Sequence, residues 1–288
     1  MEFSQSTPQR KAKTTLRPDD LLYIYEFEGT LSEPERFFPA DFLAHWREGE
    51  STFLFFSVPH EEEIRNLLTE YPQLNWIRTH TMAYKDWQGK ALLDSLSVGR
   101  FVFVPPWSSL ENIPGGICLQ LDPGVVFGSG EHPTTRDSLQ ALLEVYELDI
   151  PKKVLDLGAG TGILALAAVS LGATKVSAVD WNPACAQTTQ NNVVLNQMED
   201  RISVFEGKAE DYIEEPADLL LANLHFAVIE ELIRNPAFFE KKWVILSGLL
   251  RSEFLEIKHR LQGSDFNILK EWDSEFTWFT LMGKNGRR

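Results

Sequence analysis

The stretch Val154-Leu-Asp-Leu-Gly-Ala-Gly-Thr-Gly162 decides the fold of this chain. An apolar run that ends in closely spaced glycines is typical of a buried strand that turns sharply into a helix, here the apolar segment Ile163–Leu171. Glycines allow a ligand to approach the backbone where side chains would clash. We therefore expect a nucleotide-like ligand at Gly158, Gly160 and Gly162.

A second expected strand ends in Asp180, which follows Gly158 by 22 residues. A carboxylate at the tip of the second strand is placed to accept hydrogen bonds from the two ribose hydroxyls of an adenosine moiety. The glycines have the spacing G-x-G-x-G and are preceded by Asp156. This pattern differs from the G-x-G-x-x-G of dinucleotide enzymes and resembles motif I of S-adenosylmethionine-dependent methyltransferases. An NAD-dependent dehydrogenase remains the alternative. Asp156 is either a direct ligand contact or an acid that stabilises the fold.

Strands alternate with helices of about 10 to 15 residues after residue 135, as in βαβ units with a parallel sheet. The expected strands are Lys153–Leu157, Lys175–Asp180, Ile202–Glu206, Asp218–Asn223 and Trp243–Ser247. Two further candidates, Phe266–Glu271 and Phe276–Met282, have no room for a helix between them, so we expect an antiparallel pair that closes the sheet. The expected fold class is α/β.

The region before this sheet predicts a small α+β domain over residues 19–84. Its expected strands are residues 21–27, 52–58 and 74–78, and its expected helices are Ala40–Trp46 and Glu61–Tyr71. Residues 1–18 are expected to form a disordered tail, residues 85–123 a connector with extended segments, and residues 124–288 the ligand-binding domain.

Composition limits the classes of function. The 288 residues, 43% of them hydrophobic, contain no apolar run near the roughly 18 residues that a membrane span needs. The formal net charge of -15 disfavours direct nucleic-acid binding and suits a basic protein partner. Two cysteines, Cys118 and Cys185, make no disulfide framework, and we expect a cytoplasmic protein without a metal site.

The loop Gly124-Val-Val-Phe-Gly-Ser-Gly-Glu-His-Pro-Thr-Thr135 precedes the glycine motif. Its glycines permit positive φ or close approach, while Thr134 and Thr135 could cap a helix that begins near Arg136. We interpret the loop as a lid over the ligand, with an ordinary glycine turn as the alternative.

Two aromatic side chains of this loop are open to more than one reading. Phe127 would either form a wall of the ligand pocket or fill the core. For His132 we expect hydrogen bonds that hold the loop rather than a catalytic role.

Four blocks of the sequence together carry a specific resemblance to a known family. The block Asp122–Thr135, the block Leu155–Ala165, Ala222-Asn223 and Leu246-Ser-Gly-Leu-Leu250 together resemble the ribosomal protein L11 methyltransferase family. The resemblance implies a seven-stranded class I methyltransferase domain, Rossmann-like in architecture, preceded by a small α+β domain that recognises the substrate. It also implies S-adenosyl-L-methionine as cofactor and ribosomal protein L11 as protein partner.

The resemblance and the residue patterns together give a set of candidate cofactor contacts: Phe127, Thr134, Thr135, Asp156, Gly158, Gly160, Gly162, Asp180 and Asn223. Two positions depart from the family pattern. Asn223-Leu-His-Phe226 stands where the family usually has Asn-Ile-Leu-Ala, and Glu131 stands where threonine is common. Both departures lie where the acceptor would enter, so they bear on the substrate more than on the cofactor.

Transfer of a methyl group to an amine requires the neutral amine, and a lysine with a pKa of about 10.4 is neutral once in a few thousand molecules at pH 7. Asn223 is expected to position the donor and the amine. His225 would either accept the proton or line the rim of the pocket. Methylation of another protein lysine or a small amine, and a non-catalytic protein that binds S-adenosylmethionine, remain alternative functions.

Overall fold

The computed structural model describes residues 16–31, 34, 41–88, 95–108 and 114–286. The chain divides into two compact units, one within Lys13–Asp94 and one within Ser95–Arg288. The predicted tail lies outside the described residues except for its last three positions, where Leu16 is buried. No helix in the described part of the chain is both long and apolar enough to cross a membrane.

The larger unit is built on a seven-stranded sheet. Its strands are β8 (Lys153–Leu157), β9 (Lys175–Asp180), β10 (Ile202–Glu206), β11 (Leu219–Asn223), β12 (Trp243–Leu250), β13 (Phe266–Ser274) and β14 (Trp278–Asn285). They lie in the order β10-β9-β8-β11-β12-β14-β13. The first five are parallel, and β14 pairs antiparallel with both β12 and β13. The expected α/β fold, with an antiparallel pair closing the sheet, is confirmed.

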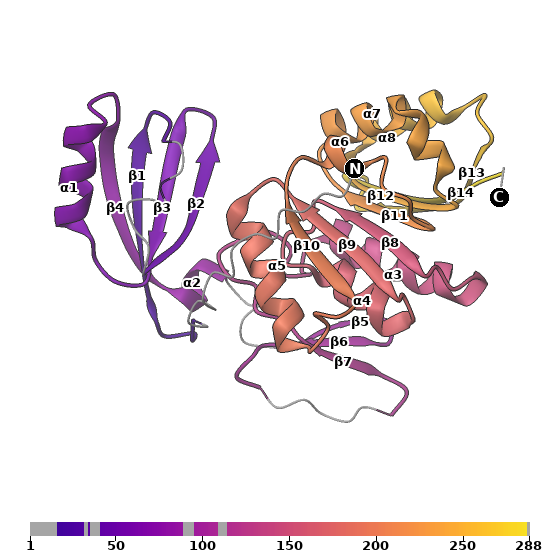
Figure 1. Cartoon of the computed structure of the whole chain (residues 1–288), viewed down its shortest axis with the longest axis horizontal. Helices are drawn as coiled ribbons and strands as arrows, with labels where there is room; N and C mark the ends of the chain where they lie inside the picture. Colours follow the sequence, from indigo (N-terminus) through magenta and orange to yellow (C-terminus); the bar gives the residue numbers. More distant parts are fainter. Residues whose placement is uncertain (1–15, 32–33, 35–40, 89–94, 109–113, 287–288) are drawn as a thin grey trace. The chain divides into compact units, whose positions relative to one another are not determined.

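Helices cover both faces of this sheet (Figure 1). They are α3 (Pro133–Leu148), α4 (Ile163–Leu171), α5 (Pro183–Leu195), α6 (Ala209–Tyr212), α7 (Phe226–Arg234), the 3₁₀ turn Pro236–Glu240 and α8 (Arg251–Leu261). The core that contains Leu139 and Val193 lies on the face of α3, α4 and α5, and the core that contains Ile229 and Ile257 lies on the face of α6, α7 and α8. A sheet covered on both faces explains why its central strands are apolar throughout.

The order of the strands places the candidate site. Chain order reverses between β8 and β11, because β9 and β10 lie on one side of β8 while β11 and β12 lie on the other. Ligands of open α/β sheets bind at the carboxyl ends of the strands at such a reversal. Gly158 and Asn223 stand at the carboxyl ends of β8 and β11, so both lie at this edge.

A three-stranded sheet belongs to the same unit. Its strands are β5 (Leu96–Val98), β6 (Phe101–Val104) and β7 (Ile117–Gln120). β5 pairs antiparallel with β6, and β6 pairs parallel with β7. Phe101 and Phe103 of β6 are buried in the core on the α4 face. The chain that we interpreted as a connector is therefore extended here, as expected, and from Ser95 onward it packs within this unit.

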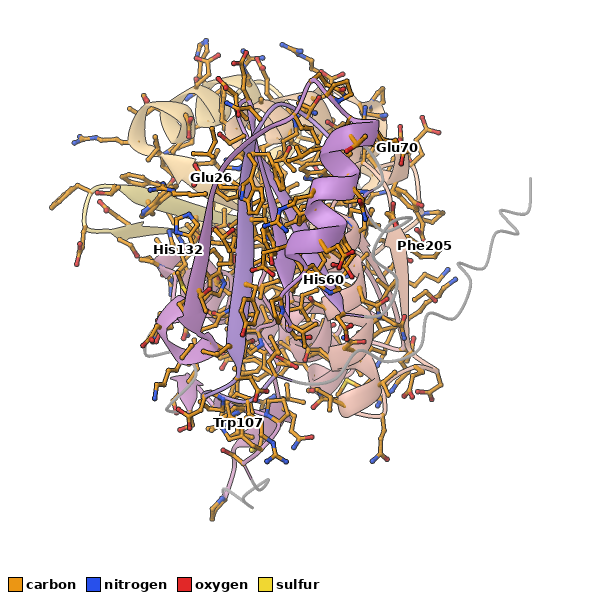
Figure 2. All side chains as sticks on the ribbon, turned by 90° about the vertical axis from the view of Figure 1, so that its left-hand side faces the viewer. Glu26, His60, Glu70, Trp107, His132 and Phe205 are labelled. Carbon is orange, nitrogen blue, oxygen red and sulfur yellow. The ribbon has the colours of Figure 1, made fainter. Side chains whose placement is uncertain are left out.

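The smaller unit is a four-stranded antiparallel sheet with a helix on one face. Its strands are β1 (Leu21–Glu28), β2 (Phe42–Glu48), β3 (Ser51–Phe56) and β4 (Asn75–Ala83), in the order β2-β3-β1-β4. His60 and Glu70 mark the two ends of α1 (Glu61–Glu70) (Figure 2). Ile64 and Leu67 of this helix share one core with Tyr25 and Phe27. A short helix, α2 (Tyr84–Gln88), follows β4.

The helix predicted at Ala40–Trp46 is wrong, because the described part of that segment is strand β2. Phe42 and Ala44 are buried while Leu43 and His45 are less so, which is the two-residue alternation of a strand. Gly49 adopts φ 60° between β2 and β3, and the two strands pair from Glu48 opposite Ser51 onward. The turn at Gly49 joins β2 and β3 into a hairpin. The hydrogen bonds between these two strands outweigh the weak helical preference of the short segment that became β2.

Candidate active site

The glycine motif forms the turn between β8 and α4. Gly158, Gly160 and Gly162 have φ values of 76°, 58° and 79°, in the left-handed region that L side chains rarely adopt. The amides of Gly158 and Ala159 donate to the Val179 carbonyl at 2.8 and 3.0 Å. The turn is thus held against the end of β9, and its conformation requires glycine.

Asp180 fixes the centre of this turn. Its Oδ2 accepts a hydrogen bond from the Gly160 amide at 2.9 Å, and its Oδ1 accepts one from the Asn182 amide at 2.9 Å. The side chain is buried, and burial raises its pKa while these two amides lower it. The structure therefore brings Gly160 and Asp180 together. Trp181, which follows, is an exposed aromatic side chain that the sequence analysis did not single out.

The loop that precedes α3 packs directly on the glycine turn. A Cβ at Gly160 would lie 2.7 Å from the Phe127 carbonyl oxygen, and the Thr161 hydroxyl donates to the Gly128 carbonyl at 2.6 Å. The Phe127 side chain is 54% exposed. Loop and turn therefore form one structure, with the Phe127 backbone against glycine and its ring directed away from the core.

Side chains of α5 hold both segments in place. Asn192 donates from Nδ2 to the carbonyls of Asp122 and Thr161, at 2.8 and 2.9 Å, and its Oδ1 accepts from the Asp122 amide. The Thr189 hydroxyl donates to the Gly160 carbonyl at 2.9 Å. These two positions were not predicted from the sequence. Asparagine disfavours helix interiors, so Asn192 inside an expected helix was the available signal.

His132, not a threonine, caps helix α3. The helix begins at Pro133, and the His132 Nδ1 accepts from the Thr134 amide at 3.4 Å and lies 2.7 Å from the Thr134 hydroxyl. Thr134 and Thr135 are buried in the first turn, so the expected threonine cap near Arg136 is wrong. The prediction that His132 holds the loop by hydrogen bonds is confirmed. Burial lowers its pKa, which favours the neutral ring that accepts a hydrogen bond.

The end of β11 connects to this helix. Asn223 donates from Nδ2 to the Thr135 hydroxyl at 3.4 Å, and the Ser247 hydroxyl donates to the Thr134 carbonyl at 3.1 Å. Gly248 has φ 88°, and a Cβ there would lie 3.1 Å from the Asn223 Oδ1. The amide of Asn223 is therefore oriented by Thr135, while its Oδ1 accepts no hydrogen bond from the residues that the structure describes.

The two departures from the family pattern lie on the surface. His225 is exposed and precedes α7 without a side-chain capping hydrogen bond. Glu131 is exposed as well, and its carbonyl accepts from Arg136 at 3.4 Å. Leu224 covers Gly158, because a Cβ on that glycine would lie 2.2 Å from the Leu224 Cδ2. Of the residues after Asn223, it is Leu224 that contacts the glycine turn.

Asp156 is a buried acid beneath the turn. Its side chain is 1% exposed, and neither carboxylate oxygen makes a hydrogen bond of ordinary geometry within the described residues. Burial raises its pKa to about 7, the Ala165 amide lowers it in part, and the charge of Asp180 raises it further. A cationic group of a ligand would favour the ionised form of this acid.

The comparison with known families concerns most of the chain. Residues 50–286 match the family described as ribosomal protein L11 methyltransferase (PrmA). The chain belongs to the ribosomal protein L11 methyltransferase family. The match includes the glycine turn, Asp180, Asn223 and the loop that packs on the turn.

Individual members of the family agree. The chain is 38% identical over 179 residues to a ribosomal protein L11 methyltransferase of Desulfitobacterium hafniense, across 60% of this chain and 56% of that protein. It is 34% identical over 231 residues to one of Gloeobacter violaceus, across 77% of this chain and 69% of that protein. The alignment with the first of these relatives thus spans little more than half of that protein's length.

A solved structure supports the same fold. The crystal structure of a ribosomal protein L11 methylase from Lactobacillus delbrueckii subsp. bulgaricus aligns with a TM-score of 0.57 at 25% identity. The alignment covers 66% of this chain and 98% of that one. The seven-stranded sheet of this chain is therefore the Rossmann-like sheet of the methyltransferase class.

Proposed function

We propose that the chain is an S-adenosylmethionine-dependent protein methyltransferase that methylates amino groups, of lysine or of the N-terminus, on ribosomal protein L11. Family membership and the names of the relatives support the reaction and the substrate. The hydrogen bond between Gly160 and Asp180 carries the assignment of the site, because it joins the glycine turn to a carboxylate at the end of β9. The proposal places the protein in the cytoplasm, where its cysteines stay free.

The residues of the site fit S-adenosylmethionine. Asp180 lies beside the glycine turn and keeps lone pairs for ribose hydroxyls beyond its two amide bonds. The unsatisfied carboxylate of Asp156 matches a ligand that carries positive charge. When bound, this cofactor supplies a methyl group on a sulfonium, which leaves as a neutral thioether. Phe127, Gly162, Thr134 and Thr135 complete the proposed cofactor site.

Asn223 is the residue that we assign to the incoming amine. The amine must be neutral, and deprotonation of a lysine at pH 7 costs about 4 to 5 kcal/mol. Asn223 presents a neutral Oδ1, fixed by the bond from its Nδ2 to Thr135, which can accept a hydrogen bond from the amine. A neutral acceptor orients the amine and stabilises its charged form less than a carboxylate, which would raise the pKa of the amine.

The proton of the amine needs an acceptor outside the cofactor cradle. His225 stands two residues after Asn223 and is exposed, and histidine is the side chain type that most often transfers protons near neutral pH. We assign it that role. The smaller unit is assigned to recognition of the protein substrate, and the net charge of -15 suits a basic partner.

Radiolabel transfer from S-adenosylmethionine into ribosomal particles that lack methylation tests the proposal. We expect label in ribosomal protein L11. Label in another protein or in a small amine would mean that this molecule, and not ribosomal protein L11, is the substrate. Calorimetric binding of the donor without any transfer would indicate a non-catalytic binding protein. No binding of the donor by the wild type would contradict the cofactor assignment, and a nicotinamide titration tests the dehydrogenase alternative.

A further inference from the structure

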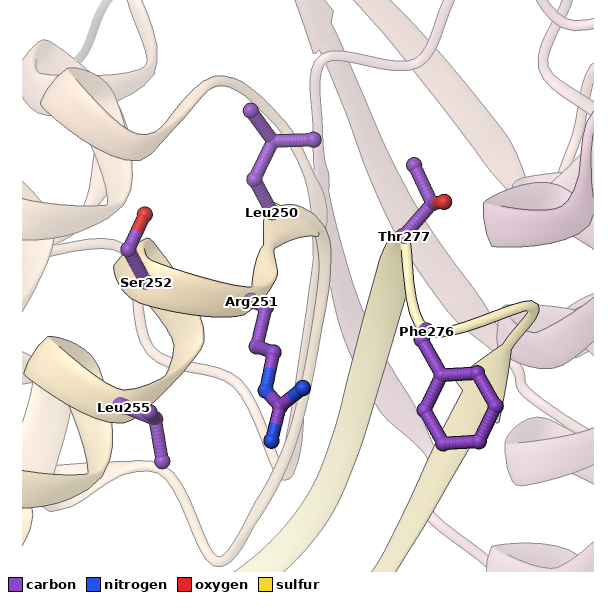
Figure 3. A pocket seen from close by; sticks show the side chains of 6 residues that line it. All are labelled: Leu250, Arg251, Ser252, Leu255, Phe276 and Thr277. Atoms are coloured by element: carbon purple, nitrogen blue, oxygen red, sulfur yellow. The ribbon is translucent and has the colours of Figure 1, made fainter.

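A groove lies beyond the end of β12, between the start of α8 and the turn that joins β13 to β14. It has a volume of about 470 Å³ and is lined by Leu250, Arg251, Ser252, Leu255, Phe276 and Thr277. Figure 3 shows Arg251 between Leu255 on one side and Phe276 on the other. Leu250, Leu255 and Phe276 are all exposed large apolar side chains, and Phe276 is 75% exposed. Exposed apolar side chains gathered around a groove indicate a binding surface.

The turn on one side of the groove is strained. Glu275 and Phe276 both have φ 56°, and the Thr277 amide donates to the Ser274 carbonyl at 3.1 Å. Two-residue turns of this type favour asparagine and glycine, because a side chain at positive φ is strained. The Phe276 amide also donates to the Asp273 Oδ1 at 2.7 Å, which holds the turn. A bulky aromatic residue in this conformation and in solvent indicates a function rather than a folding role.

Residues that line the groove adjoin residues that contact the candidate site. Leu250 pairs with Trp278 across β12 and β14, and the Trp278 ring lies 4.9 Å from the His132 ring. His132 in turn contacts the Phe127 ring at 5.4 Å. Gly248, two residues before Leu250, packs against Asn223. A chain bound in the groove would therefore lie at the same sheet edge as the residue that we assign to the amine.

Charge indicates what kind of segment the groove accepts. Exposed carboxylates stand on the turn at Asp273 and Glu275, and the whole chain carries a net charge of -15. A basic segment complements this edge. Arg251 lies inside the groove, where its aliphatic stem adds apolar surface and its guanidinium is a donor for the main-chain carbonyls of a bound segment.

We propose that this groove binds one aliphatic side chain of a basic segment of the acceptor protein, close in sequence to the amine that is methylated. The inference rests on the proposed function and extends it to the sequence around the acceptor. Phe276 and Leu255 would form the two apolar walls. The acceptor would then be selected by its neighbouring residue as well as by its amine.

Peptide binding tests this directly. The probes are labelled peptides with one lysine among arginine, glycine and serine, and with a single leucine placed at successive distances from the lysine. A matched peptide has serine in place of leucine. Fluorescence anisotropy in the presence of S-adenosylhomocysteine should show one leucine position that binds about tenfold more tightly than serine, as expected for burial of a leucine side chain. Phe276→Gly and Leu255→Ser should remove the difference, and Leu148→Ser, at the end of α3, should keep it.

Stability separates a binding role from a structural one. Phe276→Gly relieves the strained φ, so its Tm should rise while the preference for leucine disappears. Retention of the preference by Phe276→Gly and Leu255→Ser would overturn the proposal, as would equal binding of all the leucine and serine peptides by the wild type. Light scattering could instead show a dimer for the wild type and a monomer for Phe276→Gly. That result would assign the groove to a second copy of the chain and overturn the proposal. Calorimetry with S-adenosylmethionine reports separately on the proposed function, because the peptide comparison does not depend on methyl transfer.

Discussion

The amide of Gly160 donates a hydrogen bond to the Oδ2 of Asp180 at 2.9 Å, so the centre of the glycine turn is tied to the acid at the end of the neighbouring strand. The Asn182 amide binds the other oxygen of the same carboxylate. The two backbone amides hold the carboxylate of Asp180 in place, and this carboxylate holds the glycine turn. Loss of Asp180 therefore affects both the shape of the cradle and its polarity.

Asp180→Ala should weaken donor binding by at least about tenfold, because it removes a carboxylate that holds the turn and that we assign to the ribose hydroxyls of the donor. It should also lower the free energy of unfolding by about 1 to 3 kcal/mol, since one buried and one partly buried amide lose their acceptor. Asp200→Ala is the matched control, because Asp200 is exposed and pairs with Arg201 alone among the described residues. Calorimetry and urea titration measure the two effects. Equal donor affinity in both variants would contradict the role of Asp180.

Gly160→Ala should abolish donor binding, because the new Cβ would lie 2.7 Å from the Phe127 carbonyl oxygen. Gly263→Ala is the control: Gly263 also has a positive φ, 85°, but a Cβ there meets nothing within 4 Å. Both variants carry backbone strain of about 1 kcal/mol or more. Only Gly160→Ala must also displace the loop. Thermal unfolding and donor calorimetry of the pair separate strain from loss of the site.

The sequence predicted the sheet well because its signals are local. Strand β8, helix α4 and the acid at the end of β9 lie within about one βαβ unit, where apolar runs, glycines and spacing carry the information. Strand β2 was missed because its conformation depends on pairing with β3, which a seven-residue window does not contain.

The contacts that assemble the site were less accessible to sequence reasoning. Asn192 lies 70 residues from Asp122, and Asn223 lies 88 residues from Thr135. No periodicity indicates such pairs, because tertiary packing brings them together. The cap of α3 was missed for another reason: histidine is an uncommon N-cap residue, and two threonines beside it matched the usual preference.

The pH dependence of stability should report the burial of Asp156. Its pKa is about 7 in the folded protein against an ordinary value of 3.8, so the folded state binds this proton more tightly. Its contribution to stability is full below pH 3.8 and is lost as the pH rises through 7. The difference in free energy of unfolding between Asp156→Asn and the wild type should grow with pH in this window, by at most about 1.4 kcal/mol per pH unit. Urea titrations across the window measure it, and a constant difference would contradict the raised pKa.

His225→Ala tests the proposed proton acceptor. If His225 accepts the proton, wild-type kcat/KM should fall at acidic pH, where a proton acceptor becomes protonated, and the variant should lose this acidic limb together with much of its rate. Donor binding should remain unchanged, because the ring is exposed and caps no helix amide. His259→Ala, another exposed histidine, serves as the control. The same pH profile in wild type and His225→Ala would contradict proton acceptance by His225 and would indicate that it only lines the rim of the pocket.

Asn223 offers a sharper test of how the amine is handled, because two substitutions change different properties. Asn223→Ala removes the oriented oxygen, and we expect kcat to fall about 100-fold, as for a loss of orientation. Asn223→Asp keeps an oxygen but adds a negative charge, which raises the pKa of the acceptor amine. This variant should bind the cationic acceptor more tightly, with a lower KM, yet turn over more slowly and reach its maximal rate at a higher pH. A role limited to the fold predicts instead that both variants lose stability and that neither moves the pH optimum. Steady-state kinetics across pH, with thermal unfolding of each variant, distinguishes the two explanations.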